Sequence, residues 1–221
     1  MPEPHRAAIY YAPEADDPLW QAGCTWLGCD PETGERLEQP EAAGLRVNTE
    51  DPRRYGFHAT LKAPMALRTG FETFLQSAAA FAARQCPFAL PRLDVTTLDG
   101  FLALTPAVAS PELNRLAAAC VMELDKHRQP EDDATQARRA EGRSARQVQN
   151  IARWGYPLVC EDFQFHMTLT GAMESNPYED AARAHFAPAL GLRRLVESLA
   201  VFVEDEQGGP FRLLHRLPFM S

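Results

Sequence analysis

The chain has 221 residues, which suits one large domain or two small ones with a shared interface, and its 45% hydrophobic and 24% charged residues are ordinary for a globular protein. A net charge of −8 argues against broad electrostatic binding to DNA or RNA, which depends on neutralising phosphates, but still allows a local basic pocket. The sequence shows no secretory signal, and no apolar run approaches about 18 residues, so we expect a cytoplasmic protein that does not enter the membrane.

The cysteines do not predict a metal site. They form an odd, scattered set without a C-x-x-C pair, whereas zinc sites need closely spaced ligand pairs. We therefore expect reduced thiols, no metal and no cofactor. The five cysteines are Cys24, Cys29, Cys86, Cys120 and Cys160.

The first half of the chain predicts two strands, a helix and then a hairpin. Thr69 followed by Glu72 is typical of a capping box at the start of a helix. Asp99-Gly100 is a favoured dipeptide for a two-residue hairpin turn. The predicted elements are a strand at 6–13, a polar loop at 30–54, a strand at 55–64, a helix at 71–82 and two strands within 91–106.

The second half repeats this order less regularly. Ser110 before Pro111 indicates an N-cap with proline at the first helical position, and Asn176-Pro177 with Glu179 indicates another helix start. Residues 130–150 have almost no apolar side chains and predict a solvated insertion or exposed helix. The predicted elements are a helix at 111–124, the insertion at 130–150, a strand at 163–171, a helix after 176 and strands at 198–205 and 211–219.

This order predicts an α+β fold with antiparallel sheets. Each half carries a strand, a helix and a strand pair, so we expect a single bilobal domain over 1–221. Its two pseudo-twofold-related lobes fall roughly at 1–108 and 109–221, although elements can cross over. We expect the two equivalent strands to face each other across an active-site cleft.

One pentapeptide appears twice. FHATL occupies residues 57–61 and FHMTL occupies 165–169, in a chain with six histidines. A chance match of Phe, Thr and Leu around any two histidines has a probability of about three in a thousand. We interpret the pair as a duplicated functional element.

In a strand, alternate side chains share a face, which gives each copy an apolar face and a polar face. The imidazole and hydroxyl of one copy then lie about 6.6 Å apart along the strand. Two imidazoles can move one proton from a nucleophile and another to a leaving group, and threonine hydroxyls can hold phosphate oxygens. The polar faces carry His58, Thr60 and Lys62 in the first copy and His166, Thr168 and Thr170 in the second.

Two other interpretations compete with catalysis. A single His-x-Thr on a strand is usually structural, but two copies in matching phase reverse that balance. Metal ligation by His58 and His166 is a rival, although neither motif contains an Asp, Glu or Cys to complete a ligand shell.

The chain resembles the 2H phosphoesterase superfamily, named for two H-x-[ST]-x motifs, here His58-Ala-Thr-Leu and His166-Met-Thr-Leu. The flanks RRYGFHATLKAP and RWGYPLVCEDFQFHMTLTG look like a bacterial branch described as a phosphonate-metabolism protein. The resemblance implies a metal-independent phosphodiesterase with one histidine as general base and the other as general acid. It implies as substrate a nucleoside 2′,3′-cyclic phosphate or a phosphoribosyl 1,2-cyclic phosphate, and the motifs alone do not assign base and acid.

Five further residues are hypothetical phosphate contacts from their positions. Lys62 and Thr170 extend the polar faces, while the other three precede the motif strands, where loops could fold over the cleft. For each arginine, a solvated surface charge is an equal alternative. The five are Lys62, Thr170, Arg54, Arg153 and Tyr156.

Two other function classes stay open: a non-catalytic phosphate-binding or nucleotide-binding module, and RNA 2′–5′ end processing or ligation. The acidic balance and the lack of a basic stripe with interleaved aromatics disfavour long RNA. We expect a small phosphorylated substrate as partner and favour a monomer.

Overall fold

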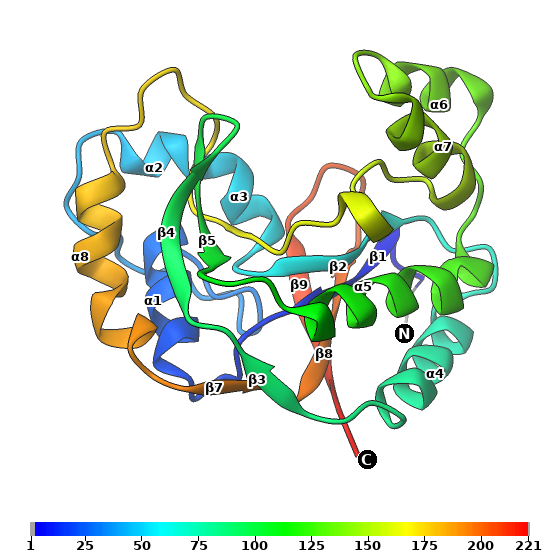
Figure 1. Ribbon diagram of the computed structural model, residues 1–221, viewed down its shortest axis with the longest axis horizontal. Coiled ribbons are helices and arrows are strands. Elements are labelled where there is room, and N and C mark those ends of the chain that lie inside the picture. The colour runs from blue at the N-terminus through cyan, green and yellow to red at the C-terminus, as the bar shows by residue number, and fades with distance from the viewer. Residues whose placement is uncertain (1–2, 221) are drawn as a thin grey trace.

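The computed structural model describes residues 3–220. Seven strands form one antiparallel sheet in the order β4-β5-β6-β2-β1-β8-β9, and two short strands, β3 and β7, pair separately (Figure 1). The strands are β1 Arg6–Tyr11, β2 Ala59–Met65, β3 Phe88–Leu90, β4 Leu93–Leu98, β5 Phe101–Pro106, β6 Met167–Thr168, β7 Arg194–Val196, β8 Ser198–Glu204 and β9 Phe211–Pro218. The α-helices are α1 Pro18–Leu27, α2 Leu45–Asn48, α3 Glu50–Tyr55, α4 Phe71–Ala82, α5 Pro111–Leu124, α6 Asp133–Ala140, α7 Ala145–Trp154 and α8 Glu179–Leu190.

Each end of the sheet draws strands from both halves of the chain. β1 and β2 lie beside β8 and β9, whereas β6 joins the hairpin of β4 and β5. Strands from before and after residue 108 therefore lie side by side in this sheet. The two expected sheets are joined into one where Ala59 of β2 pairs with Met167 of β6.

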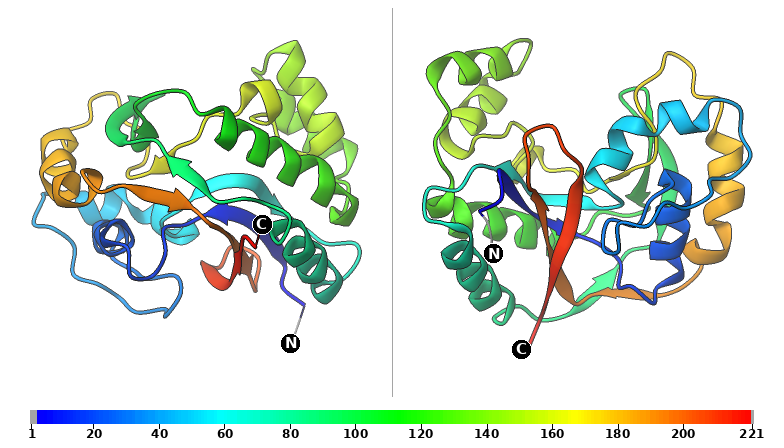
Figure 2. Two further views of the ribbon diagram at one scale, coloured as in Figure 1. Left: turned by 60° about the horizontal axis from the view of Figure 1, so that its bottom comes forward. Right: turned by 180° about the vertical axis from the view of Figure 1, so that it is seen from behind.

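Helices cover one face of the sheet at both ends. α4 and α5 pack against β8, β9 and β2, while α8 packs against β4 with α1 beside it (Figures 1 and 2). Phe57, next to the first motif, lies against Phe186 of α8 with ring centroids 6.1 Å apart. It also lies against Gly23 of α1, where an added Cβ would be only 2.0 Å from the Phe57 ring. This close approach requires glycine and locks the apolar side of the motif into the core.

Two turn and cap predictions are confirmed. The Ser110 hydroxyl accepts a hydrogen bond from the Leu113 amide at the start of α5. Asp99 and Gly100, with φ of 45° and 87°, connect β4 and β5 in a two-residue turn. Left-handed backbone at both positions is the requirement of a type I′ hairpin, which Asp-Gly meets at low cost.

Two cap predictions are wrong. α4 begins after Gly70 without a side-chain cap, because the Thr69 hydroxyl instead bonds to Nδ1 of His127 at 2.7 Å. α8 begins at Glu179 without one as well. The Asn176 side chain donates to the Thr170 hydroxyl at 2.9 Å and accepts from the amide of Tyr178 at 3.2 Å, before the helix starts.

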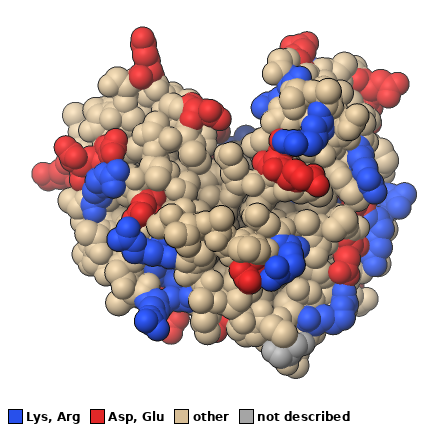
Figure 3. Space-filling view, in the orientation of Figure 1, with Lys and Arg blue, Asp and Glu red and all other residues tan. Residues whose placement is uncertain are grey.

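Residues 130–150 contribute most of two short helices, α6 and α7, which we call the α6–α7 arm (residues 133–154). Ser144 and Gln147 form a capping box at the start of α7. The arm stands apart from the sheet in Figure 1, and Figure 3 shows the surface hollowed between the arm and the lobe that carries α2 and α8. Among the helices of residues 3–220, none combines the length and apolar character needed to span a bilayer.

Candidate active site

The two motifs keep the alternation predicted from the sequence. The first, third and fifth residues of each pentapeptide are buried, while the histidine and the threonine between them are partly exposed. The buried residues are Phe57, Ala59 and Leu61 in the first copy and Phe165, Met167 and Leu169 in the second. The polar and apolar faces of both motifs therefore have the same phase. α5 and α8 lie on the apolar side of the motif strands, whereas α3 lies on the polar side, where Arg54 bonds Glu204 and Tyr55 stacks on Phe211.

The motif strands are neighbours in the sheet, which corrects the expectation that they face each other across a cleft. Extending the Ala59–Met167 pair by one residue in each direction places His58 opposite Thr168 and Thr60 opposite His166. These four side chains form an alternating tetrad on one face of the sheet. The histidines occupy diagonal corners, where Cα atoms lie about 7–8 Å apart.

His58 is held in one tautomer and kept neutral. Its Nδ1 lies 2.9 Å from the carbonyl oxygen of Gly56, which can only accept, so Nδ1 carries the hydrogen and Nε2 is left as the acceptor. Nε2 lies 3.3 Å from the Thr60 hydroxyl. Burial lowers the pKa of His58 to about 4, despite the Gly56 bond that opposes this change, and the charge of nearby His166 lowers it further.

His166 repeats this geometry. Its Nδ1 lies 2.8 Å from the carbonyl oxygen of Gln164, again two residues upstream, so its Nε2 is also the free nitrogen. Phe101 of β5 lies beside the ring at a centroid distance of 5.7 Å. Both histidines thus present Nε2 to the tetrad, which suits one to accept and the other to donate a proton.

Two neighbouring hollows lie beside the tetrad. The first, of about 10 Å³, is lined by Thr60, His166 and Tyr156 among others. A second, of about 220 Å³, shares the walls Ala63, Tyr156 and Val159 with the first and is lined by several basic side chains. A larger hollow of about 1000 Å³ between residues 28–54 and 205–212 contains none of the tetrad residues, so we do not place the site there.

Lys62 does not share the face of Thr60, contrary to the sequence-based expectation. Tyr10 of β1 pairs with Thr60 but its neighbour Ile9 pairs with Lys62, so β2 carries an extra residue, a β-bulge, at Leu61. The bulge inverts the phase and turns Lys62 toward α5. There its Nζ lies 3.0 Å from Asp125, and the side chain is only 3% exposed.

Thr170 also leaves the predicted face, because β6 ends at Thr168. Its buried hydroxyl accepts hydrogen bonds from the Leu102 amide at 3.0 Å and from the Asn176 side chain at 2.9 Å. It holds the loop after the motif and does not line either hollow beside the tetrad.

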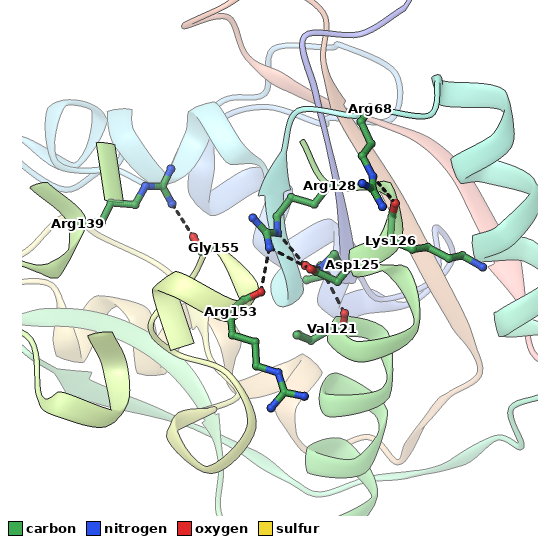
Figure 4. Close-up of polar contacts among 9 residues, drawn as sticks. Arg68, Val121, Asp125, Lys126, Arg128, Arg139, Arg153 and Gly155 are labelled. Atoms are coloured by element: carbon green, nitrogen blue, oxygen red, sulfur yellow. Dashed lines mark hydrogen bonds and ion pairs between the residues drawn. The ribbon is translucent and has the colours of Figure 1, made fainter. Parts of the chain in front are cut away.

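The three residues before the motifs have different surroundings. Arg54 pairs with buried Glu204 at 2.6 Å and lines the large hollow. Arg153 is exposed, with its guanidinium 4.5 Å from the Trp154 ring centroid, and Figure 4 shows it pointing away from the contacts of Arg128 and Arg139. Tyr156 alone of these lies beside the tetrad. The phosphate-binding roles of all three stay predictions.

Tyr10 is the neighbour that sequence reasoning missed. Its ring stacks on the imidazole of His58 at a centroid distance of 3.7 Å and an interplanar angle of 19°. Tyr10 is 1% exposed, and its ring covers one face of the His58 imidazole. The contact follows from the position of Tyr10 in β1, opposite Thr60 of β2. The sequence does not show that β1 pairs with β2, so the contact could not be predicted from it.

In residues 3–220, no three His, Cys, Asp or Glu side chains come together as a metal-binding group. The cysteines described there are all free thiols.

Comparison with known proteins gives one family and several relatives. The family model described as "Protein of unknown function (DUF1045)" matches residues 60–212. Ribose 1,5-bisphosphate phosphokinase PhnN of Janthinobacterium sp. (strain Marseille) is 40% identical over 230 residues, covering 97% of this chain and 51% of the relative. The protein of the same name from Laribacter hongkongensis (strain HLHK9) is 37% identical over 215 residues, covering 94% and 50%. The chain spans about half the length of these curated relatives.

Solved structures match over the full length at low identity. TT0787 of Thermus thermophilus has a TM-score of 0.50 and 15% identity, covering 98% of each chain. E. coli LigT complexed with 3′-AMP has a TM-score of 0.49 and 17% identity, covering 99% of this chain and all of LigT. Such likeness concerns the fold alone. The α+β fold implied by the resemblance to 2H phosphoesterases is confirmed.

Proposed function

The chain belongs to the family described as "Protein of unknown function (DUF1045)", and we propose that it hydrolyses a small cyclic phosphodiester by paired-histidine acid–base catalysis without a metal. The tetrad of His58, Thr60, His166 and Thr168 carries this proposal. Its support is that two imidazoles and two hydroxyls share one face of the sheet, with both Nε2 atoms free of backbone contacts.

His58 is the general base in this proposal. Its imidazole is neutral near pH 7, because its pKa lies at about 4, so Nε2 can accept a proton from water. The water oxygen attacks phosphorus as its proton moves to Nε2 of His58. The bond from phosphorus to the ester oxygen breaks, and that oxygen takes a proton from Nε2 of His166. Exchange with solvent then returns both imidazoles to their starting states.

The diagonal placement of the histidines supports this sequence of proton transfers. Displacement at phosphorus requires the attacking and leaving oxygens to lie roughly in line, on opposite sides. Thr60 and Thr168 occupy the other diagonal, where their hydroxyls can donate to the non-bridging oxygens. The Thr168 hydroxyl has no hydrogen-bond partner within residues 3–220, which leaves it available to substrate.

Among cyclic esters we favour a phosphoribosyl 1,2-cyclic phosphate over nucleoside 2′,3′-cyclic phosphates. Water attack with loss of the O2 oxygen leaves the phosphate on C1. From a substrate that also carries a 5-phosphate, the product is ribose 1,5-bisphosphate, the compound in the printed name of the two curated relatives. This match links the proposed reaction to the phosphonate-metabolism role implied by the sequence resemblance.

The test is hydrolysis of both ester classes in EDTA, with the product position read by ³¹P NMR. We expect turnover that survives EDTA, with the phosphate of the 1,2-cyclic ester retained on C1. Absence of turnover on every ester, while phosphorylated ligands still raise the melting temperature, would favour a non-catalytic binding module.

A further inference from the structure

The hollow of about 220 Å³ beside the tetrad has the walls and charge of an anion site. It shares the wall residue Tyr156 with the small hollow lined by Thr60 and His166, so the two hollows are neighbours. At about 30 Å³ per water, its volume corresponds to roughly seven water molecules. That is room for a phosphate on a short arm and lies below the roughly 300–1,000 Å³ of pockets that hold larger ligands.

Positive charge exceeds negative charge around this hollow, because four cations that line it pair with three carboxylates. The cations are Arg6, Lys62, Arg128 and Arg139. The carboxylates are Asp125, which pairs with both Lys62 and Arg128, Glu131, and Glu204, which also pairs with Arg54 of the large hollow. In a chain with a net charge of −8, this local excess is the feature expected of a focused anion pocket.

Several of these cations are committed to the protein. Figure 4 shows Arg128 bridging Asp125 and the Arg153 carbonyl, and Arg139 donating to the Gly155 carbonyl. Arg139 also pairs with Glu131 at 2.7 Å. These contacts fix the pocket wall where the α6–α7 arm joins the sheet.

Arg6 differs because neither of its Nη atoms has a hydrogen-bond partner within residues 3–220. Its Nε contacts Glu204 at 2.5 Å, and its guanidinium carbon lies 5.4 Å from the centroid of the Phe211 ring. Arg6 lies on β1 in the same phase as Tyr10, so it faces the same side of the sheet as the tetrad. A guanidinium with two open nitrogens is well suited to a phosphate.

The Tyr156 hydroxyl adds a donor to this set. Tyr156 lines both hollows, and its hydroxyl has no hydrogen-bond partner in the described chain. Burial raises the pKa of this phenol, so it stays neutral and can donate.

From this arrangement we propose that Arg6 and Tyr156 form a subsite for a second, non-reacting phosphate monoester of the substrate, next to the cyclic phosphate at the tetrad. The inference rests on the proposed function and narrows its substrate class to sugar cyclic phosphates that carry another phosphate. It predicts that the 5-phosphate of a phosphoribosyl 1,2-cyclic phosphate contributes to binding.

Binding of ribose 5-phosphate tests the subsite separately from catalysis. We expect calorimetry to show binding to the wild type and to a His58→Ala/His166→Ala double variant. Arg6→Gln and Tyr156→Phe should each weaken it by about 10- to 100-fold, the loss of a hydrogen bond to a charged group. Tyr11→Phe is the matched control, because this buried tyrosine lies on the opposite face of β1 and should bind like the wild type.

Kinetics provide the second arm. The preference in kcat/KM for the 5-phosphorylated 1,2-cyclic ester over its unphosphorylated form should fall by about tenfold or more in the same two variants. If Arg6→Gln does not fold, Tyr156→Phe still decides, since it removes one oxygen atom. The subsite proposal is refuted if ribose 5-phosphate does not bind the folded wild type, or if Tyr156→Phe binds it with the same affinity as the wild type. Absence of hydrolysis with variant-sensitive binding intact refutes the proposed function alone.

Discussion

The neutral state of buried His58 should make the protein less stable in mild acid. Its folded pKa of about 4 lies below the ordinary value of 6.5, so the unfolded chain takes up a proton first as the pH falls. The stabilisation is therefore fully present above pH 6.5 and is lost between pH 6.5 and 4. At 1.36 kcal/mol per pH unit, the loss reaches about 2 kcal/mol at pH 5 and about 3 kcal/mol near pH 4.

The perturbation that isolates this effect is His58→Asn. The asparagine amide can donate to the Gly56 carbonyl as Nδ1 does, but it does not titrate. Urea unfolding of both proteins from pH 7.5 to 4.5 should show the free energy of unfolding falling more steeply for the wild type, by about 2 kcal/mol at pH 5. Carboxylates elsewhere titrate in both proteins and cancel. Parallel pH dependences would refute the reasoning that burial keeps His58 neutral.

Three further predictions follow from the site. Tyr10→Val removes the ring stacked on His58, so an NMR titration should show the His58 pKa rising toward 6.5; an unmoved pKa would mean that other groups bury it. Lys62→Met removes one cation that pairs with Asp125, so it should lower the free energy of unfolding by about 1–3 kcal/mol. Unchanged stability would show that this ion pair contributes nothing. Thr60→Val and Thr168→Val should each reduce kcat/KM on a cyclic ester about tenfold or more, and full activity in both would exclude the threonines from phosphate binding.

Features written in a few neighbouring residues could be predicted from the sequence. The polar and apolar faces of both motifs follow from the period of two in a strand, and the Asp99-Gly100 turn follows from the backbone conformations these residues accept. Ser110 caps its helix as predicted because the hydroxyl bonds only within the first turn, to Glu112 and Leu113, in the part of the chain that the structure describes.

Features that depend on distant pairing could not be predicted. The bulge that turns Lys62 away from Thr60 exists only in the pairing of β2 with β1, and the stacking of Tyr10 on His58 has the same origin. The Thr69 cap failed because His127, 58 residues away, takes its hydroxyl. Tertiary contacts override local preference at such positions.

The adjacency of the two motifs belongs to this second group. The repeat of the motif is visible in the sequence, but the tetrad depends on β2 and β6 pairing at Ala59 and Met167 across 108 residues. A shift of that register by one residue would move the second histidine to the apolar face. The resemblance to a two-motif family predicted that the copies act together, and the pairing supplies the physical reason.

The central claim, that His58 and His166 act as one catalytic unit, is tested most directly by comparing kcat/KM on a 1,2-cyclic phosphate for His58→Ala, His166→Ala and the double variant. Each single variant should lose about 10²- to 10⁴-fold. The double variant should be scarcely slower than either, because groups that act as a unit are strongly non-additive. A single variant with wild-type activity, or losses that multiply fully in the double variant, would contradict paired acid–base catalysis.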